Sequence, residues 1–151
     1  QLHYMNKGGA SDISALGLKI ILTNAFHSSS YQTASGQTVY GGEACGIIMV
    51  LEDGESIYHA GDTAIFGDMA LLGELYRPEV CFLPIGDVVT MGPRDAALAT
   101  KLIRPDVVIP VHYNSLPYLT GTPTAFAEEV EALGVQTEVV ILQPGETYTS
   151  E

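Results

Sequence analysis

The pattern of apolar residues changes partway along the chain, from strands around a tight turn to helices and strands in alternation. Apolar runs at residues 45–51 and 56–59 flank Asp53-Gly54, a dipeptide that favours the positive φ angles of a hairpin turn. From residue 65 onward, helical stripes alternate with short apolar strands. We therefore predict an α/β layered domain, in which an antiparallel part joins alternating helices and strands.

Each predicted element has a local signal. Strands are predicted at residues 18–23, 45–51, 56–59, 79–84, 106–111 and 137–142, where apolar and β-branched residues are concentrated. Helices are predicted from apolar stripes at residues 65–76, 93–103 and 123–133, the last two with a proline in the first turn. Residues 28–42, rich in Ser, Gln, Gly and Thr, are predicted to form a long loop.

Composition limits the classes of function. The chain has 151 residues, of which 46% are hydrophobic, enough for one domain over residues 1–151 with one core. No apolar run approaches the roughly 18 residues of a membrane span, so no membrane association is expected. The net charge of −12, with only six Lys and Arg, argues against nucleic-acid binding.

Two further features bear on context. The cysteines, Cys45 and Cys81, each lie in an apolar run, which is typical of buried free thiols and predicts a reducing, cytoplasmic location. The chain starts Gln1-Leu2 without an initiator Met or a secretory signal. We therefore expect it to begin inside a longer protein.

Three residues of types that can bind metals follow predicted strands: His27, Asp62 and His112. Ligands bind at strand ends in layered α/β folds, and two imidazoles with a carboxylate suit Zn²⁺, Mn²⁺ or Fe²⁺. Each residue also has an ordinary interpretation. A single histidine at a strand end is usually hydrogen-bonded within the protein, and Asp62 could cap a helix that begins near Ala64.

Five short motifs, in order along the chain, carry a resemblance. They are Phe26-His-Ser-Ser-Ser, Tyr58-His-Ala-Gly-Asp-Thr, Leu83-Pro-Ile-Gly-Asp, Thr90-Met-Gly-Pro and Val108-Ile-Pro-Val-His-Tyr-Asn. The sequence resembles the uncharacterised metal-dependent hydrolases of the metallo-β-lactamase superfamily, close to the lactonase and phosphodiesterase branches. The resemblance implies an αββα sandwich with its site at one edge, between the two sheets.

The resemblance also implies site roles. His27 would bind one metal, His112 a second, and Asp62, the catalytic carboxylate, would bridge the two. The cofactors would be two divalent ions, zinc first with Mn²⁺ or Fe²⁺ as alternatives, which activate a water to attack a small-molecule ester, lactone or phosphodiester.

Other residues have two interpretations each. His59 could support the metal ligands without binding the metal, or it could pack on a strand. Asp87 could be another supporting carboxylate or a turn residue. Ser28 and Asn114 could line the substrate pocket or form loop hydrogen bonds, as could three further residues, Ser29, Tyr40 and Tyr113.

The defining His-x-His-x-Asp-His motif of the superfamily is absent from this sequence, as are the family's first strands. The chain thus resembles a C-terminal half. We expect a partner, either the N-terminal half of the same protein or a separate subunit, to supply the remaining ligands; a homo-oligomer is also compatible. The alternatives are a non-catalytic binding or structural module derived from such an enzyme, and an α/β domain that binds a small molecule without metal.

Overall fold

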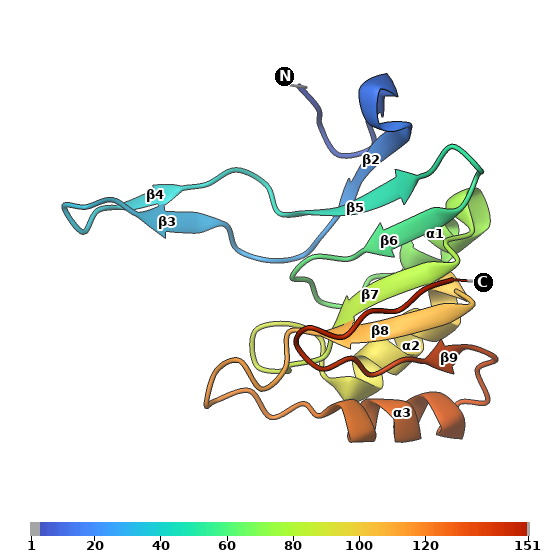
Figure 1. The fold of residues 1–151 in the computed structure, drawn as a ribbon. Coiled ribbons are helices and arrows are strands. Elements are labelled where there is room, and N and C mark those ends of the chain that lie inside the picture. The colour runs from blue at the N-terminus through green and yellow to red at the C-terminus, as the bar shows by residue number, and fades with distance from the viewer. Residues whose placement is uncertain (1–3, 151) are drawn as a thin grey trace.

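A mixed sheet is the central element of the computed structural model, which describes residues 4–150 (Figure 1). In spatial order its seven strands are β1 (Ala10–Ile13), β2 (Leu18–Asn24), β5 (Cys45–Val50), β6 (Ser56–His59), β7 (Val80–Pro84), β8 (Val107–Val111) and β9 (Glu138–Val139). Strands β1, β2, β5 and β6 pair antiparallel, whereas β6 to β9 pair parallel. The predicted α/β class, with an antiparallel part joined to alternating units, is confirmed.

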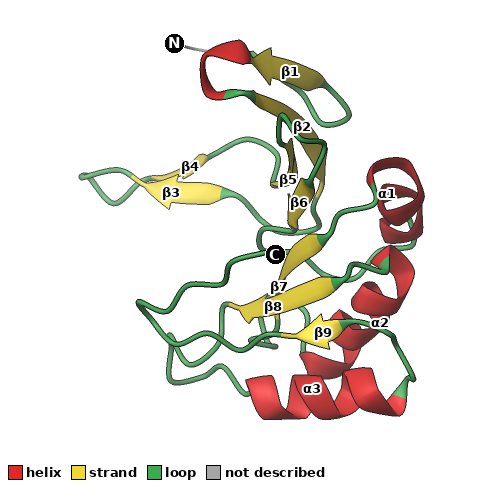
Figure 2. Cartoon of the chain, turned by 45° about the vertical axis from the view of Figure 1, so that its right-hand side comes forward, coloured by secondary structure: helices red, strands yellow, loops and turns green. Residues whose placement is uncertain are grey.

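The helices all lie on one face of this sheet (Figure 2). They are α1 (Met69–Tyr76), α2 (Pro93–Ile103) and α3 (Pro123–Ala132), and a short 3₁₀ helix, Ser14–Leu16, joins β1 to β2. Helices α2 and α3 begin at the predicted prolines, because the first turn needs no N–H at that position. The Thr122 hydroxyl oxygen caps α3 by accepting a hydrogen bond from the Ala125 N–H, at 3.2 Å.

The hydrophobic core lies between the helices and the central strands. Helix α2 contributes small side chains, including the fully buried Ala96 and Ala99, and so can approach the sheet closely. The strands contribute larger side chains at alternate positions, Tyr58 on β6, Leu83 on β7 and Val108 on β8, each fully buried. This alternation follows the period of two in a strand, which directs every second side chain to the helical layer.

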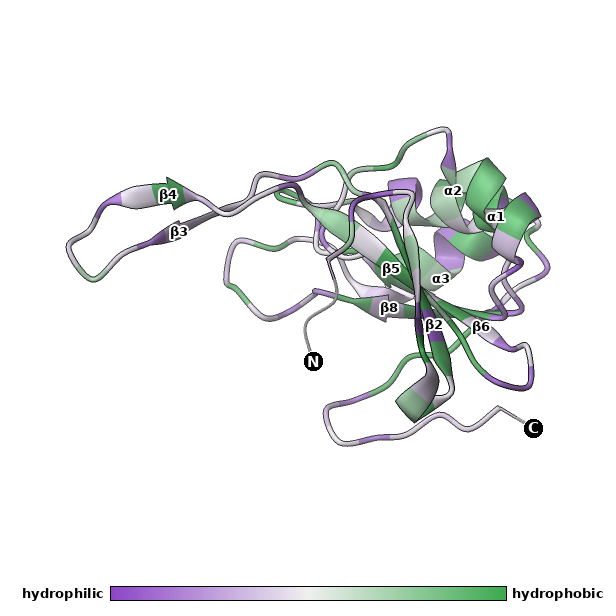
Figure 3. Ribbon diagram, turned by 90° about the horizontal axis from the view of Figure 1, so that it is seen from above, coloured by the Kyte–Doolittle hydropathy of each residue, from purple (hydrophilic) through white to green (hydrophobic). Residues whose placement is uncertain are grey.

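The segment 28–42 differs from the prediction of a long loop. It contains a hairpin, β3 (Ser30–Gln32) paired with β4 (Thr38–Tyr40), which projects from the body as an arm (Figures 1 and 3). The prediction was wrong here because the arm packs neither face on the core, so its sequence has no apolar alternation to indicate strands.

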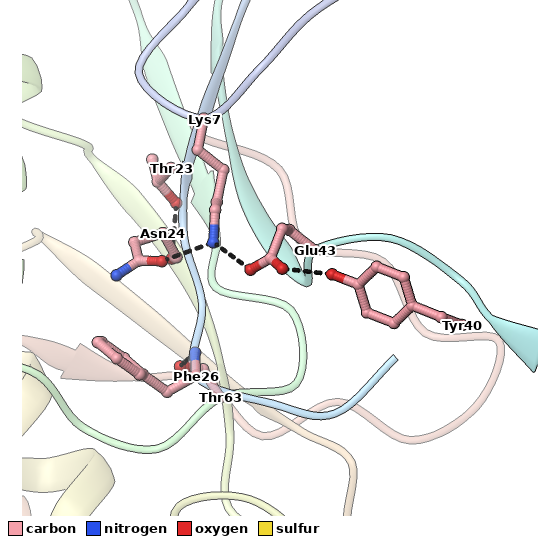
Figure 4. Close-up of polar contacts among 7 residues, drawn as sticks. All are labelled: Lys7, Thr23, Asn24, Phe26, Tyr40, Glu43 and Thr63. Atoms are coloured by element: carbon pink, nitrogen blue, oxygen red, sulfur yellow. Dashed lines mark hydrogen bonds and ion pairs between the residues drawn. The ribbon is translucent and has the colours of Figure 1, made fainter. Parts of the chain in front are cut away.

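The base of the arm is tied to the sheet by a polar network (Figure 4). The Lys7 ammonium donates to Asn24 Oδ1, at 2.9 Å, and forms an ion pair with Glu43 Oε2, at 3.3 Å. The Tyr40 hydroxyl donates to the other carboxylate oxygen of Glu43. The network thus joins the N-terminal segment, the end of β2 and the end of β4.

Three elements also differ from the predictions by more than one residue at an end. Strand β1 was not predicted. Helix α1 begins at Met69 and not at residue 65, because Phe66 packs its ring on Phe26, with centroids 5.5 Å apart, before the helix starts. The predicted strand 137–142 pairs with β8 only over Glu138–Val139, since the chain then leaves the sheet edge.

The face of the sheet opposite the helices is only partly covered. The C-terminal segment runs along it and encloses a hollow of about 330 Å³ with the sheet side chains. Leu142 and Tyr148 line this hollow from the segment, and Ile57, Phe82 and Ile109 line it from the strands. Residues 4–150 therefore supply one large sheet and one helical layer of the four-layer sandwich that the resemblance implies.

Both cysteines are free thiols. Cys81 is fully buried, as predicted, and burial raises its pKa well above the usual thiol range. Cys45 is only half-buried.

No helix within residues 4–150 combines the length and the apolar character that a membrane crossing needs.

Candidate metal centre

The three predicted ligands meet at one edge of the sheet. Strands β2, β6, β7 and β8 run in the same direction, because β2 and β6 are both antiparallel to β5 and the others are parallel to β6. Their carboxyl ends therefore share an edge. His27 follows β2, Asp62 follows β6 and His112 directly follows β8. All three line the same open pocket of about 460 Å³.

Asp62 and His112 form the closest pair in this pocket. Asp62 Oδ1 lies 3.7 Å from His112 Nε2, which is too long for a hydrogen bond. Two ligand atoms bound to one tetrahedral metal ion at about 2.0–2.1 Å lie roughly 3.3–3.4 Å apart. The separation is thus closer to that of two ligands of one cation than to a hydrogen-bonded pair.

His112 has two further unusual features. Its φ angle is +57°, a left-handed conformation that is costly for a residue with a side chain. Its Nδ1 atom is buried and has no hydrogen-bond partner among the described residues, which is rare for a buried polar atom. Nearby residues share the backbone feature, since Asp87, Val88 and Asn114 also have positive φ angles. Such strain concentrates at functional sites.

His27 is less firmly placed. The residue is exposed, and its Nδ1 lies 2.6 Å from the Ser28 carbonyl oxygen. A carbonyl can only accept, so in the neutral ring Nδ1 carries the proton and Nε2 is the nitrogen that can bind a metal. Within residues 4–150, however, no three His, Cys, Asp or Glu side chains group tightly enough to hold a metal ion. Asp62 and His112 therefore form an incomplete site, with His27 on the pocket wall.

His59 lies apart from the pocket lining. Its ring stacks on Phe82, with centroids 5.6 Å apart and planes 16° from parallel, and its Nδ1 accepts from the Gly61 N–H at 3.0 Å. The residue is partly exposed. Partial desolvation of its ring lowers the pKa of His59, and the negative charge of Asp62 partly opposes this. These contacts match strand packing, one of its two predicted roles.

Asp87 has the contacts of a turn residue. One carboxylate oxygen accepts from the Val88 N–H at 2.8 Å, and the other accepts from the Thr120 hydroxyl at 3.0 Å.

Asp62 does not cap a helix, because α1 begins only at Met69. That alternative is wrong.

The remaining candidates divide between the pocket and its surroundings. Ser28 lines the pocket, whereas Asn114, Ser29, Tyr40 and Tyr113 do not. The Tyr113 hydroxyl instead donates to the Leu142 carbonyl, at 3.4 Å.

Four pocket residues were not predicted: Phe26, Val89, Leu116 and Tyr118. They give the pocket apolar walls and one phenolic hydroxyl. All lie in segments that follow strand ends, which is the signal that could have identified them.

Comparison with known proteins identifies relatives of this chain. The sequence model of the family described as "Beta-lactamase superfamily domain" matches residues 1–113. A "UPF0173 metal-dependent hydrolase" from Rubrobacter xylanophilus is 49% identical over 146 residues, 97% of this chain and 60% of the relative. A similarly named hydrolase from Methanopyrus kandleri is 49% identical over 144 residues, 95% of this chain and 61% of the relative.

Solved structures share the fold of this chain. Igni18, described as a novel metallo hydrolase from Ignicoccus hospitalis, matches with a TM-score of 0.82 and 42% identity, over 97% of this chain and 60% of that protein. The metallo-β-lactamase fold protein YhfI from Bacillus subtilis matches with a TM-score of 0.66 and 9% identity, over 92% of this chain and 52% of that protein. The chain thus spans about 60% of the length of the curated relatives it matches.

Proposed function

The chain belongs to the β-lactamase superfamily, and on that premise we propose that it supplies His27, Asp62 and His112 as ligands of a dinuclear metal-dependent hydrolase. One observation carries the proposal: Asp62 and His112 lie 3.7 Å apart in a pocket that His27 also lines. The names of the relatives, metal-dependent hydrolases, support the same activity.

The donor set fits a divalent metal. Two imidazoles and a carboxylate favour zinc, with Mn²⁺ and Fe²⁺ as the alternatives. The bound ions would supply Lewis-acid activation of water and of the substrate's polar bond, which suits hydrolysis of an ester, lactone or phosphodiester.

The residues of this chain have distinct roles in the proposal. Asp62 has two carboxylate oxygens and can contact two cations, and its charge offsets the repulsion between them. The Nε2 atoms of His27 and His112 are the imidazole donors. Phe26 and Leu116 give the pocket walls an apolar surface, and the Tyr118 hydroxyl can orient a polar substrate atom.

A partner segment completes the proposal. The described residues hold too few grouped ligands for a metal site, and the relatives are longer than this chain. Ile57 and Phe82 also lie on a sheet face that the helices leave uncovered. We infer that the N-terminal half of the same protein, or a separate subunit, packs on this face and brings the other ligands. The cytoplasmic location, predicted from Cys45 and Cys81, belongs to the same proposal.

The test uses the intact protein, with the partner segment present. Metal content and the hydrolysis of a nitrophenyl phosphodiester and of a simple lactone are measured for the wild type and for Asp62→Ala and His59→Ala. We expect two zinc ions and turnover in the wild type. Asp62→Ala should lose metal and activity, and His59→Ala should retain most of both because its ring packs on Phe82.

Two results would count against the proposal. Metal without turnover on either substrate class would favour the non-catalytic module. Loss of metal to the same extent in His59→Ala as in Asp62→Ala would make His59 a ligand and the ligand assignment wrong.

A further inference from the structure

We propose that Thr63 is a positioning residue, which holds the His27 segment against the Asp62 loop; this inference rests on the proposed function. Thr63 is fully buried. Its hydroxyl oxygen accepts from the Phe26 N–H at 2.9 Å (Figure 4). The hydroxyl also donates to the Ala64 carbonyl at 2.8 Å. The Ala64 N–H in turn donates to the Phe26 carbonyl at 3.2 Å. One side-chain hydrogen bond and one backbone hydrogen bond therefore join the segment at Phe26 to the segment at Thr63 and Ala64.

The same residue reaches a third segment of the site. The Thr63 carbonyl accepts from the Met91 N–H at 3.0 Å, and the Met91 carbonyl accepts from the Asp87 N–H, also at 3.0 Å. These bonds hold the loop that follows β7. Thr63 thus links the chain segments beyond the ends of β2, β6 and β7, three strands whose carboxyl ends share the site edge.

Two of the proposed metal ligands are the sequence neighbours of the hydrogen-bonded residues Phe26 and Thr63. Phe26 directly precedes His27, and Thr63 directly follows Asp62. Among the interactions of residues 4–150, the His27 ring has a hydrogen bond only to its own neighbour, the Ser28 carbonyl. The position of His27 relative to Asp62 therefore depends on the backbone at Phe26, which the Thr63 hydroxyl and the Ala64 N–H both hold.

A purely structural role is the rival explanation, because any buried hydroxyl with a satisfied hydrogen bond contributes to stability. Thr100 provides a matched control. It is also fully buried, and its hydroxyl donates to the Ala96 carbonyl at 2.8 Å within helix α2. Its hydrogen bond lies inside that helix and joins no segments of the site.

The experiment compares Thr63→Val, Thr63→Ser and Thr100→Val in the intact protein. Zinc affinity is measured by competition with a chromogenic chelator, and folding by urea unfolding. Valine preserves the shape and removes the hydroxyl, whereas serine preserves the hydroxyl. Residues that orient metal ligands typically change metal affinity by about 10–100-fold when mutated. We expect a loss of that size in Thr63→Val and near wild-type affinity in Thr63→Ser and Thr100→Val.

The outcomes separate this inference from the function on which it rests. A wild type that binds no zinc overturns the proposed function, and the inference with it. A wild type that binds zinc, with Thr63→Val binding equally well, overturns the inference alone. If Thr63→Val does not fold, Thr63→Ala against Thr63→Ser makes the same comparison, because these variants differ by one oxygen atom.

Discussion

Gly86→Ala should displace His112 through a steric clash. Gly86 is buried at the turn after β7, and its Cα faces the residue that follows β8. A Cβ at this position would lie 2.3 Å from the His112 carbonyl oxygen and 3.1 Å from its Nδ1. Gly86 does not have a positive φ angle, so the substitution adds no backbone strain of its own and tests the contact alone.

The size of the effect follows from this distance. Non-bonded heavy atoms pack at about 3.5 Å, so the backbone at His112 or Gly86 must move by roughly 1 Å. Overpacking of this kind typically costs about 1–3 kcal/mol of stability. A displacement of about 1 Å in a catalytic group can cost roughly 100-fold in rate. We therefore expect a moderate loss of stability and a large loss of metal-dependent activity.

Gly67→Ala is the matched control. Gly67 is exposed and lacks a positive φ angle, and a Cβ added there would have no heavy atom within 4 Å. Both substitutions restrict the unfolded chain equally, so their difference reports the clash. The assay is urea unfolding together with zinc affinity and turnover in the intact protein. Equal stability, affinity and turnover in the two variants would refute the argument that Gly86 sets the position of His112.

Other contacts give three further predictions. Partial desolvation of the ring lowers the pKa of His59, so the unfolded state binds more protons than the folded state as pH falls below about 6.5. The unfolding free energy should therefore fall more in the wild type than in His59→Gln between about pH 7.5 and 5.5; equal slopes would contradict this. Cys45 should react with a thiol reagent in the folded protein while Cys81 stays protected. Equal reaction rates of the two thiols would contradict this prediction. Thr122→Ala should lose about 1 kcal/mol of stability by removing the α3 cap, and an unchanged urea midpoint would exclude that role.

Elements with a buried face could be predicted from the sequence. Helix α2 was predicted at its observed bounds, because Pro93 marks its start and alanines define its buried stripe. Strands β5 and β6 followed from apolar runs around Asp53-Gly54. The arm could not be predicted, since β3 and β4 have no buried face. The last strand was predicted over residues 137–142 but covers only Glu138–Val139, because the C-terminal segment then leaves the sheet to cover its other face.

The shared pocket of the three candidate ligands was predictable from the sequence, and their relative geometry was less so. Residues after parallel strands share an edge, so the convergence of His27, Asp62 and His112 on one pocket follows from strand direction. Which ligands lie closest could not be predicted, because it depends on backbone conformation at single residues, such as the positive φ of His112. The connection through Thr63 was also missed, since a threonine after Asp62 has no sequence signature of its own.

The most direct test of the proposed metal centre is a crystal structure of the intact protein loaded with zinc, with the metal positions fixed by anomalous scattering. We predict two zinc ions in the pocket. Asp62 should contact both, with His27 on one and His112 on the other, at the usual zinc–ligand distances of about 2.0–2.2 Å. Zinc bound elsewhere, or bound in this pocket without Asp62 and His112, would contradict the proposal.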